Sequence, residues 1–448
     1  MKDLTSGNES RLIFNFAIPM LMGNVFHQLY NIVDSVIVGR FIGTEALAAV
    51  GSSFPIVFTL ISLIIGIGTG GTIVIAQYFG ARDIQNVKRT IDTLYIFIFF
   101  ASILITIIGL LASEAIFHLI KLPPEVIPLA KLYLNIFFAG IIFSFGFSAT
   151  TAILGGLGDS KTPLYFLIIS TILNILLDLL LVVGFKWGIA GAAWATVISQ
   201  ATAFFMAVIY LNRRHEIINL SFRKMYFDRG IFRKSLRIGF PVGFQQAFVA
   251  LSFLAMFWIV NPFGAKVSAA YSIGMRIDSF AAMPAMAFAA ALATFAGQNL
   301  GASKTERVRT GFYATLRMIF LISVLMTLIA VLFRHGLMTL FTRDEDVIRT
   351  GSDYLVIVSS FYVVFSAMIV IGGVMRGSGD TLIPMFTTLF VLWVVRIPAS
   401  YWLSRHFDVN GIWWGIPIAW CLGLFLQYGY FLTGRWKKKV IVKYQAEP

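Results

Sequence analysis

The sequence repeats itself once, and corresponding motifs lie about 221 residues apart. The segment QYFGA begins at Gln77, and the segment QNLGA begins at Gln298. The same offset relates the Gly-Asp pair that begins at Gly158 to the pair that begins at Gly379. An internal repeat of this length in a hydrophobic chain is typical of transporters, in which two similar bundles of helices enclose a substrate path.

The composition excludes an ordinary soluble protein. Hydrophobic residues make up 58% of the chain, charged residues make up 12%, and the mean hydropathy is +0.84, whereas soluble domains carry roughly a quarter charged residues. The uncharged runs at 93–113 and 132–158 each exceed the ~20 residues that a helix needs to cross a bilayer. The single cysteine, Cys421, excludes an intramolecular disulfide and a cysteine metal cluster.

The apolar runs predict an all-α membrane protein with twelve transmembrane helices in two pseudo-symmetric six-helix lobes, residues 1–222 and 223–448. Because each repeat holds an even number of spans, both lobes have the same orientation, and an axis along the membrane normal relates them. The first span lacks a cleavage pattern and is predicted to be a mature helix rather than a signal peptide. The predicted spans are 12–38, 46–76, 93–113, 132–155, 164–184, 189–211, 236–260, 267–297, 312–333, 354–375, 383–403 and 412–433.

The net charge of +14 is a topology signal. If the N-terminus is cytoplasmic, 23 of the 35 Lys and Arg residues fall in cytoplasmic segments, and the connection at 212–237 alone carries eight. This is the positive-inside pattern of multi-pass proteins, in which basic loops face anionic lipid. We therefore expect both termini in the cytoplasm, contact with membrane lipids and no nucleic-acid partner.

The first span carries a polar helix face that hydrocarbon cannot accommodate. A carboxylate such as Asp34 costs at least ~2.5 kcal/mol within a bilayer unless it is paired or protonated, which favours a functional role for it. The alternative is that the small amides of this face only pack between helices. Pro19 lies earlier in the same span, where it removes one backbone hydrogen bond and permits a bend. Polar residues at helical spacing make up the face: Asn24, His27, Gln28, Asn31, Asp34 and Ser35.

A second polar group lies in spans 5 and 6. Asn174 and Asp178 share one face of span 5, and Thr196 follows in span 6 at an equal distance from the turn between them. An antiparallel hairpin places these residues at one depth, roughly 10 Å below the external surface and similar to that of Asp34. Such oxygen ligands suit a hard cation such as Na⁺, and two nearby carboxylates can also share a proton.

The second repeat provides an internal control, because it lacks these acids. If the polar residues only stabilised the scaffold, the second repeat should retain some of them. We therefore interpret them as a dedicated site in the N-terminal lobe. The matching positions are Ala255 or Met256 for Asp34, Val395 for Asn174, Ala399 for Asp178, and Ile416 or Pro417 for Thr196.

Other features restrict the class of function. No DDxxD, HExxH or paired-histidine motif occurs within a span, so an enzyme is not predicted. No G-x-x-x-x-G-K-[ST] motif occurs, so the energy source is expected to be an ion gradient rather than a nucleotide, and no cofactor is expected. Asp278 in span 8 either binds a cationic substrate or pairs with a residue of another span.

With these motifs, the chain resembles the multidrug and toxic compound extrusion (MATE) transporters of the MOP flippase superfamily. The resemblance covers essentially the whole chain and rests on the repeat, the paired glutamine motifs, NIVDSVIVG at 31–39 and EALAAVG at 45–51. The residues Asn174, Asp178 and Thr196 resemble the DinF-like branch. That branch implies H⁺ or Na⁺ coupling at Asp34, Asn174, Asp178 and Thr196, and bending of the first helix at Pro19.

The resemblance implies a monomeric secondary antiporter of the bacterial inner membrane. Its substrates would be cationic or amphiphilic small molecules such as drugs, exported in exchange for H⁺, Na⁺ or both. The substrate cavity would be lined by candidates from the first and eighth spans: Asn24, His27, Gln28, Asn31 and Asp278.

A flippase for a lipid-linked oligosaccharide or another amphiphilic lipid is the alternative function. A flippase of this fold is expected to line its cleft with several cationic residues. In this chain only Arg276 and Arg396 qualify.

Overall fold

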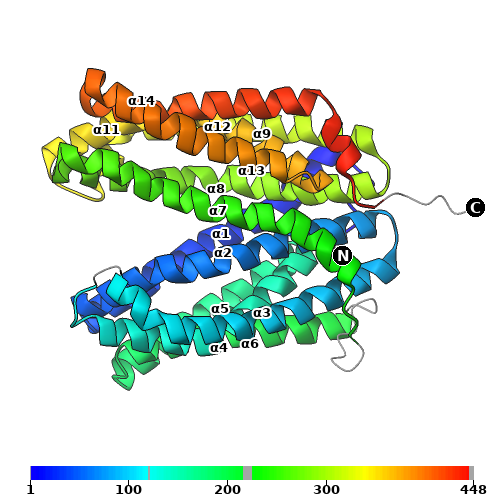
Figure 1. Ribbon diagram of the computed structural model, residues 1–448, viewed down its shortest axis with the longest axis horizontal. Coiled ribbons are helices and arrows are strands. Elements are labelled where there is room, and N and C mark those ends of the chain that lie inside the picture. Colours follow the sequence, from blue (N-terminus) through cyan, green and yellow to red (C-terminus); the bar gives the residue numbers. More distant parts are fainter. Residues whose placement is uncertain (1, 120–121, 215–224, 443–448) are drawn as a thin grey trace, which may run out of the picture. The chain divides into compact units, whose positions relative to one another are not determined.

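The computed structural model describes residues 2–119, 122–214 and 225–442, and these residues form helices without any β-strand. Figure 1 shows the helices in chain order. The first repeat contains α1 (Glu9–Phe41), α2 (Thr44–Gly80), α3 (Ile84–Leu119), α4 (Ile127–Gly156), α5 (Lys161–Asp178), η1 (Leu179–Gly184) and α6 (Ile189–Arg214). The second contains α7 (Arg229–Val260), η2 (Asn261–Phe263), α8 (Ala265–Gly301), α9 (Thr305–Leu332), α10 (Arg334–Thr339), α11 (Glu345–Ser359), α12 (Tyr362–Ser378), α13 (Leu382–Leu389), η3 (Phe390–Arg396), α14 (Ile397–Leu432) and η4 (Arg435–Lys439).

The predicted all-α membrane fold is confirmed. Within the described ranges, nine helical segments are long and apolar enough to span a bilayer, and the bent pair α11 and α12 makes a tenth. The helix α2, whose apolar part Ile64–Gly80 is shorter than these segments, is assigned as the eleventh. The 51-residue segment Leu382–Leu432 contains two spans, because the backbone leaves the helical conformation at Phe407 and Asp408. The total is therefore the predicted twelve.

Three spans differ from the simple helices that were predicted. The predicted span 354–375 begins inside α11 and continues into α12, and the two helices meet at a 49° bend. The fifth span of each repeat continues into a π-helix, η1 in the first repeat and η3 in the second. Hydropathy averages over a window and does not report how backbone hydrogen bonds pair, so it could not show either feature.

The described residues cluster into two compact units, and the units do not coincide with the sequence repeats. Unit 1 holds Met1–Asp3 and Ile18–Gly243, and unit 2 holds Leu4–Ala17 and Phe244–Pro448. The lobes predicted from sequence, 1–222 and 223–448, follow the repeat, whereas the units follow the contacts. As a result, the start of α1 belongs to unit 2, and the start of α7 belongs to unit 1.

The sequence repeat is also a repeat of backbone conformation. Six of the eleven positive-φ residues in the described ranges form three pairs that are 221 positions apart, at the turns that separate equivalent helices. Glycine adopts positive φ at little cost, which explains why the two Gly-Asp motifs recur at equivalent helix ends. The pairs are Gly43 (126°) and Gly264 (100°), Arg82 (61°) and Ser303 (60°), and Gly158 (79°) and Gly379 (91°).

Helix packing repeats in the same way within each unit. In unit 1 a Cβ atom on Gly156 of α4 would lie 2.8 Å from the carbonyl oxygen of Thr72 in α2. In unit 2 a Cβ atom on Gly377 of α12 would lie 2.5 Å from the carbonyl oxygen of Ala293 in α8. Gly377 lies 221 positions after Gly156, and Ala293 lies 221 positions after Thr72, so the contact itself is repeated. Small residues permit such close approach of backbones, on which helix association in membranes depends.

The start of α7 packs on α2 through glycines on both helices. Gly66 and Gly70 of α2 face Gly239 and Gly243 of α7, so each helix presents two glycines four residues apart. A Cβ atom on Gly239 would lie 2.5 Å from the Cα atom of Ile67. The backbones therefore touch, and α7 is fixed to unit 1 along this stretch.

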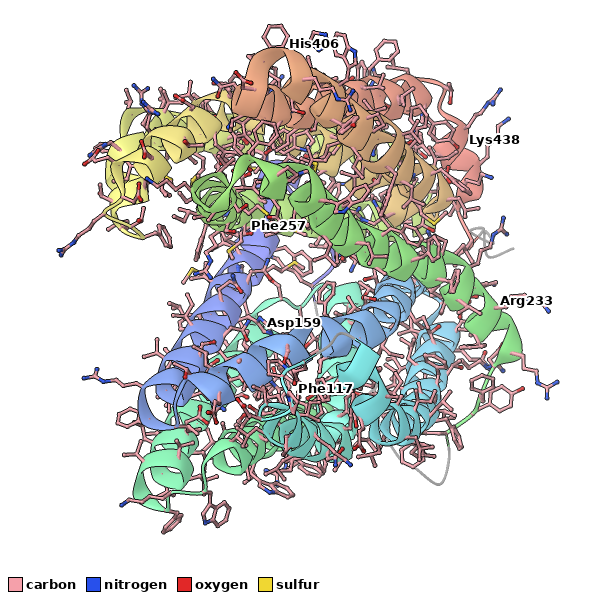
Figure 2. All side chains as sticks on the ribbon, turned by 60° about the vertical axis from the view of Figure 1, so that its left-hand side comes forward. Phe117, Asp159, Arg233, Phe257, His406 and Lys438 are labelled. Atoms are coloured by element: carbon pink, nitrogen blue, oxygen red, sulfur yellow. The ribbon has the colours of Figure 1, made fainter. Side chains whose placement is uncertain are left out.

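Basic side chains at the ends of helices project away from the ribbon. Figure 2 shows this for Arg233 near the start of α7 and for Lys438 in η4, both of which are exposed. Part of the basic connection used to predict topology, residues 215–224, lies outside the described residues, as does the tail from 443.

Candidate functional site

Three helices of unit 1 bring the predicted polar residues into the interior. Asp34 lies on α1, Asn174 and Asp178 lie on α5, and Thr196 lies on α6. Asn174 and Asp178 are fully buried, and Asp34 and Thr196 are 8% and 6% exposed. The helices α5 and α6, which carry Asp178 and Thr196, pack against each other.

The helix that carries Asp178 changes its hydrogen-bonding pattern at that residue. α5 ends at Asp178, and the π-helix η1 begins at Leu179. π-helical turns are rare and occur frequently at functional sites, because they redirect side chains and weaken the regular backbone pairing. Asp178 therefore lies at a local irregularity of an otherwise regular apolar span.

The polar side chains make contact with one another across the helices. The hydroxyl groups of Tyr30 and Thr196 hydrogen-bond at 2.9 Å, which joins α1 to α6. The buried carboxyl groups of Asp34 and Asp178 are close enough to interact electrostatically, which couples α1 to α5. Two carboxylates can hydrogen-bond to each other only when one of them carries a proton.

The cluster also contains buried polar atoms with no hydrogen-bond partner. Both oxygens of Asp178, one oxygen of Asp34, and both polar atoms of the Asn174 amide are buried and make no hydrogen bond within the described part of the chain. The five ion pairs found among the described residues do not include either carboxylate. Buried charge without a partner is costly, so the arrangement suits a proton or a small cation bound between the oxygens.

Sequence reasoning missed two tyrosines of this cluster. Tyr30 lies one turn before Asp34 on α1 and contacts Thr196. Tyr133 on α4 is within electrostatic range of both Asp34 and Asp178. Tyrosine is grouped with the hydrophobic residues in the composition, so neither residue stood out as polar. The spacing of Tyr30 and Asp34, four residues apart, is the signal that could have identified the first.

The other candidates of the first span lie outside this cluster. Asn24 and His27 are exposed in the described structure, and Gln28 and Asn31 are half-buried. The side chains of His27 and Asn31 contact each other at 3.3 Å, one turn apart on α1. Of the predicted polar face, Asp34 is the residue that reaches the buried group.

Asp278 belongs to unit 2 and to a separate polar group. Its carboxylate accepts hydrogen bonds from Tyr362, at 2.5 Å, and from Tyr354. Arg396 is buried near this group and donates to the hydroxyl of Tyr271 at 3.2 Å. Asp278 thus has hydrogen-bond partners from α11 and α12.

The equivalent positions of unit 2 contain apolar side chains. Met256 and Ile416, which correspond to Asp34 and Thr196, belong to the hydrophobic core around Trp413. The acidic cluster of unit 1 therefore has no counterpart at the repeat-related positions, although the helices around it are repeated.

We expect Tyr30→Phe to lower stability without removing any charge. The variant loses the hydroxyl contact with Thr196, and a buried hydrogen bond contributes about 1 kcal/mol. The measurement is the apparent melting temperature in detergent, compared with Tyr313→Phe, which alters a tyrosine that is exposed on α9. Equal melting temperatures for the two variants would show that the Tyr30 contact does not stabilise unit 1.

Comparison with known proteins shows similarity along the whole chain. The profile of the family described as MatE matches residues 19–180 and 241–402. "Probable multidrug resistance protein YoeA" of Bacillus subtilis is 33% identical, over 96% of this chain and 94% of the relative. "Probable multidrug resistance protein YpnP" of the same organism is 32% identical, over 97% of both chains. The fold is similar to "Crystal structure of MATE in the straight conformation", with a TM-score of 0.91 and 24% identity over 97% of this chain and 98% of the other.

Proposed function

Because this chain belongs to MatE, the multidrug and toxic compound extrusion family of transporters, we propose that it exports cationic or amphiphilic small molecules in exchange for H⁺ or Na⁺. The family consists of transporters rather than enzymes, and it uses ion gradients. The single observation that carries the exchange mechanism is the buried pair Asp34 and Asp178, whose oxygens lack a compensating charge.

The proposed coupling site consists of Asp34, Asn174, Asp178 and Thr196. A Na⁺ ion would take carboxylate, amide and hydroxyl oxygens as ligands, which are the donors that hard cations prefer. A proton would instead be shared between the two carboxyl groups, which are buried and interact electrostatically. Either ion removes the cost of two uncompensated charges, so the site binds it in preference to remaining empty.

Exchange follows if ion and substrate favour different conformations of α1. A ligand shifts a conformational equilibrium only through unequal affinity for the two states. An ion bound at Asp34 draws that part of α1 towards α5, whereas an ionised Asp34 favours a hydrated arrangement. Pro19 lies fifteen residues earlier in α1 and has no backbone N–H to donate, so it is the weakest point at which α1 can bend.

The proposed location is the bacterial inner membrane, with both termini in the cytoplasm. This placement is supported by the exposed basic residues at the start of α7 and in η4, which face the anionic leaflet in this orientation. We propose that the protein acts as a monomer, because the two repeats already supply both bundles of a transporter of this kind.

A lipid-linked oligosaccharide flippase is not favoured. A pyrophosphate headgroup would require several available cations. Among the described residues of the two candidate spans, Arg276 is exposed, but Arg396 is buried against Tyr271. The relatives reported above are named as multidrug resistance proteins.

The direct test is transport by the purified protein in proteoliposomes. A fluorescent organic cation should accumulate when either a pH gradient or a Na⁺ gradient is imposed in the exchange direction, and accumulation should stop when an ionophore dissipates that gradient. Accumulation that is independent of both gradients would disprove the exchange mechanism. The same vesicles, loaded with a fluorescent lipid-linked sugar, test the flippase alternative.

A further inference from the structure

The residues before α1 bind to unit 2 through the main chain. The N–H group of Leu4 donates to the side-chain oxygen of Gln298 at 2.9 Å, and its carbonyl oxygen accepts from the Asn299 amide at 3.1 Å. Leu4 is 1% exposed, and Gln298 and Asn299 are fully buried. This is the second of the two glutamine motifs noted in the sequence, and the proposed transport mechanism does not use it.

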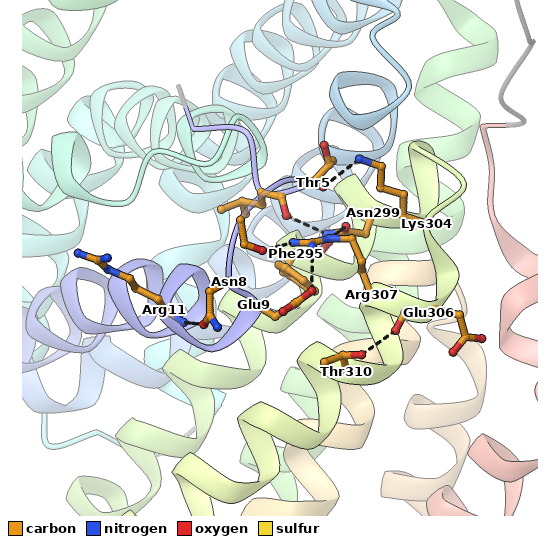
Figure 3. Close-up of polar contacts among 12 residues, drawn as sticks. Thr5, Asn8, Glu9, Arg11, Phe295, Asn299, Lys304, Glu306, Arg307 and Thr310 are labelled. Atoms are coloured by element: carbon orange, nitrogen blue, oxygen red, sulfur yellow. Dashed lines mark hydrogen bonds and ion pairs between the residues drawn. The ribbon is translucent and has the colours of Figure 1, made fainter.

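Arg307 of α9 extends the same contact along the segment (Figure 3). Each of its three nitrogens has its own partner: Nε donates to Asn299 at 3.1 Å, Nη2 donates to the carbonyl of Gly7 at 2.9 Å, and Nη1 pairs with Glu9 at 2.7 Å. Lys304 adds a bond to the carbonyl of Thr5 at 3.0 Å. A lysine at position 307 could not satisfy three partners in this fixed geometry.

We propose that Gln298, Asn299 and Arg307 form a docking site for the chain's own residues 4–9, and that this docking site fixes the start of α1 to unit 2 throughout the transport cycle. The ligand is an extended peptide segment, which is recognised through its main-chain groups and the carboxylate of Glu9. The recognition is therefore of one specified segment rather than of an apolar surface.

Unit 1 contains an equivalent arrangement at the repeat-related position, which supports the proposal. Asn299 corresponds to Tyr78, whose hydroxyl accepts from Lys234 at 2.9 Å. The segment before α7 also binds, since the N–H of Asp228 donates to Thr93 at 3.0 Å. In each unit, residues of the glutamine motif and of the helix that follows it thus bind the segment at the start of the first helix of the other repeat.

The docking site gives α1 a mechanical role in coupling. The boundary between the units crosses α1 after Ala17, two residues before Pro19, and crosses α7 after Gly243, two residues after Pro241. A change of α1 at Asp34 can be transmitted to unit 2 only if its first turns are held there. The bending required during transport is then absorbed at the two prolines, where the helical hydrogen bonding is already interrupted. This role in coupling rests on the proposed function, whereas the docking itself does not.

Loss of the docking contact is tested with Arg307→Gln. Hydrogen exchange of the amides in residues 4–9 should accelerate about tenfold, because charge-assisted bonds that restrict local opening are lost. The transport rate should also fall about tenfold, since the link to unit 2 is weakened. Arg307→Lys should resemble Arg307→Gln in both measurements. Arg309→Gln, an equal change of charge at an exposed position of α9, should alter neither.

These outcomes separate the docking site from the proposed function. Unchanged exchange in Arg307→Gln would overturn the docking site, and faster exchange with normal transport would overturn its role in coupling. If Arg307→Gln does not fold, Glu9→Gln replaces it, because that variant removes the ion pair and keeps the arginine. If the proposed ion site is wrong, Asp178→Asn should transport normally, and this result does not depend on hydrogen exchange or transport in the Arg307 variants.

A reversible cross-link tests whether the segment remains docked. Cys421 is replaced by Ser, and Thr5 and Lys304, whose main-chain and side-chain atoms meet, are replaced by Cys and joined with a short reducible bifunctional thiol reagent. The cross-linked protein should transport within about twofold of its reduced form, because the joined residues do not separate. Loss of transport that a reducing agent restores would show that the segment undocks in each cycle and would overturn the proposal.

Discussion

Replacing Asp178 by Asn is expected to slow ion-driven export at least about tenfold while the protein still folds and inserts into the membrane. Asparagine keeps the shape of the side chain but cannot bind or release a proton, and the loss of one charged ligand weakens a cation site by more than the ~1.4 kcal/mol that a tenfold change represents. Because Asp178 is fully buried beside Asp34, water cannot compensate for the missing charge. The measurement is the initial rate of dye accumulation in proteoliposomes with an imposed gradient.

Asp353→Asn is the matched control, since it makes the same chemical change at an exposed carboxylate of α11. Its transport rate should equal that of the unmodified protein. Ala399, the repeat-related position, should also tolerate a change to Val or Ser. Normal gradient-driven transport by Asp178→Asn, at equal amounts of inserted protein, would rule out this carboxylate as the coupling group.

The second large effect concerns the packing of α7 on α2. We expect Gly239→Val to destabilise unit 1 by about 3 kcal/mol or more, because overpacking that displaces backbone exceeds the usual cost of an enlarged side chain. The new Cβ atom would lie 2.5 Å from the Cα atom of Ile67 and 2.6 Å from the carbonyl oxygen of Gly66. Neither is a side-chain atom that could rotate away, so the helices must separate.

Thermal unfolding followed by size-exclusion chromatography measures this loss. Gly429→Val is the control, since a Cβ atom on this glycine of α14 meets nothing within 4 Å. The control should melt with the unmodified protein, whereas Gly239→Val should melt at a clearly lower temperature or fail to accumulate in the membrane. Equal melting of the two variants would show that the close approach of α2 and α7 can relax without cost.

The sequence was sufficient to predict the features of the fold that depend on burial in lipid. Twelve apolar runs and a 221-residue repeat lead directly to twelve spans in two similar bundles, because a helix is the simplest structure that satisfies its own backbone within lipid. The residues of the candidate site could be picked out from the sequence for a related reason. A carboxylate such as Asp34 or Asp178 is so unfavourable inside an apolar span that its position alone attracts attention.

Other features depend on contacts that leave no local pattern. Leu4 binds Gln298 across 294 residues of chain, and nothing in the sequence near either residue indicates that they meet. Consequently the division at 222 and 223 follows the repeat but not the exchange of segments between the units. Tyr30 and Tyr133 were missed because a phenol is compatible both with lipid and with a polar site. The bend between α11 and α12 lies at Ser360 and Phe361, without a proline to mark it.

The exchange of helix starts between the units has a consequence for biosynthesis. Unit 2 requires Leu4–Ala17, which the ribosome makes before Ile18–Gly243 of unit 1, together with Phe244–Pro448, which it makes after them. Residues Leu4–Ala17 therefore lack their packing partners in unit 2 until Phe244–Pro448 have been made and inserted into the membrane. In this respect the protein resembles a domain-swapped dimer whose two subunits have been joined into one polypeptide. Two half-length chains made separately would be incomplete alone, and each would regain its missing piece only by assembling with the other.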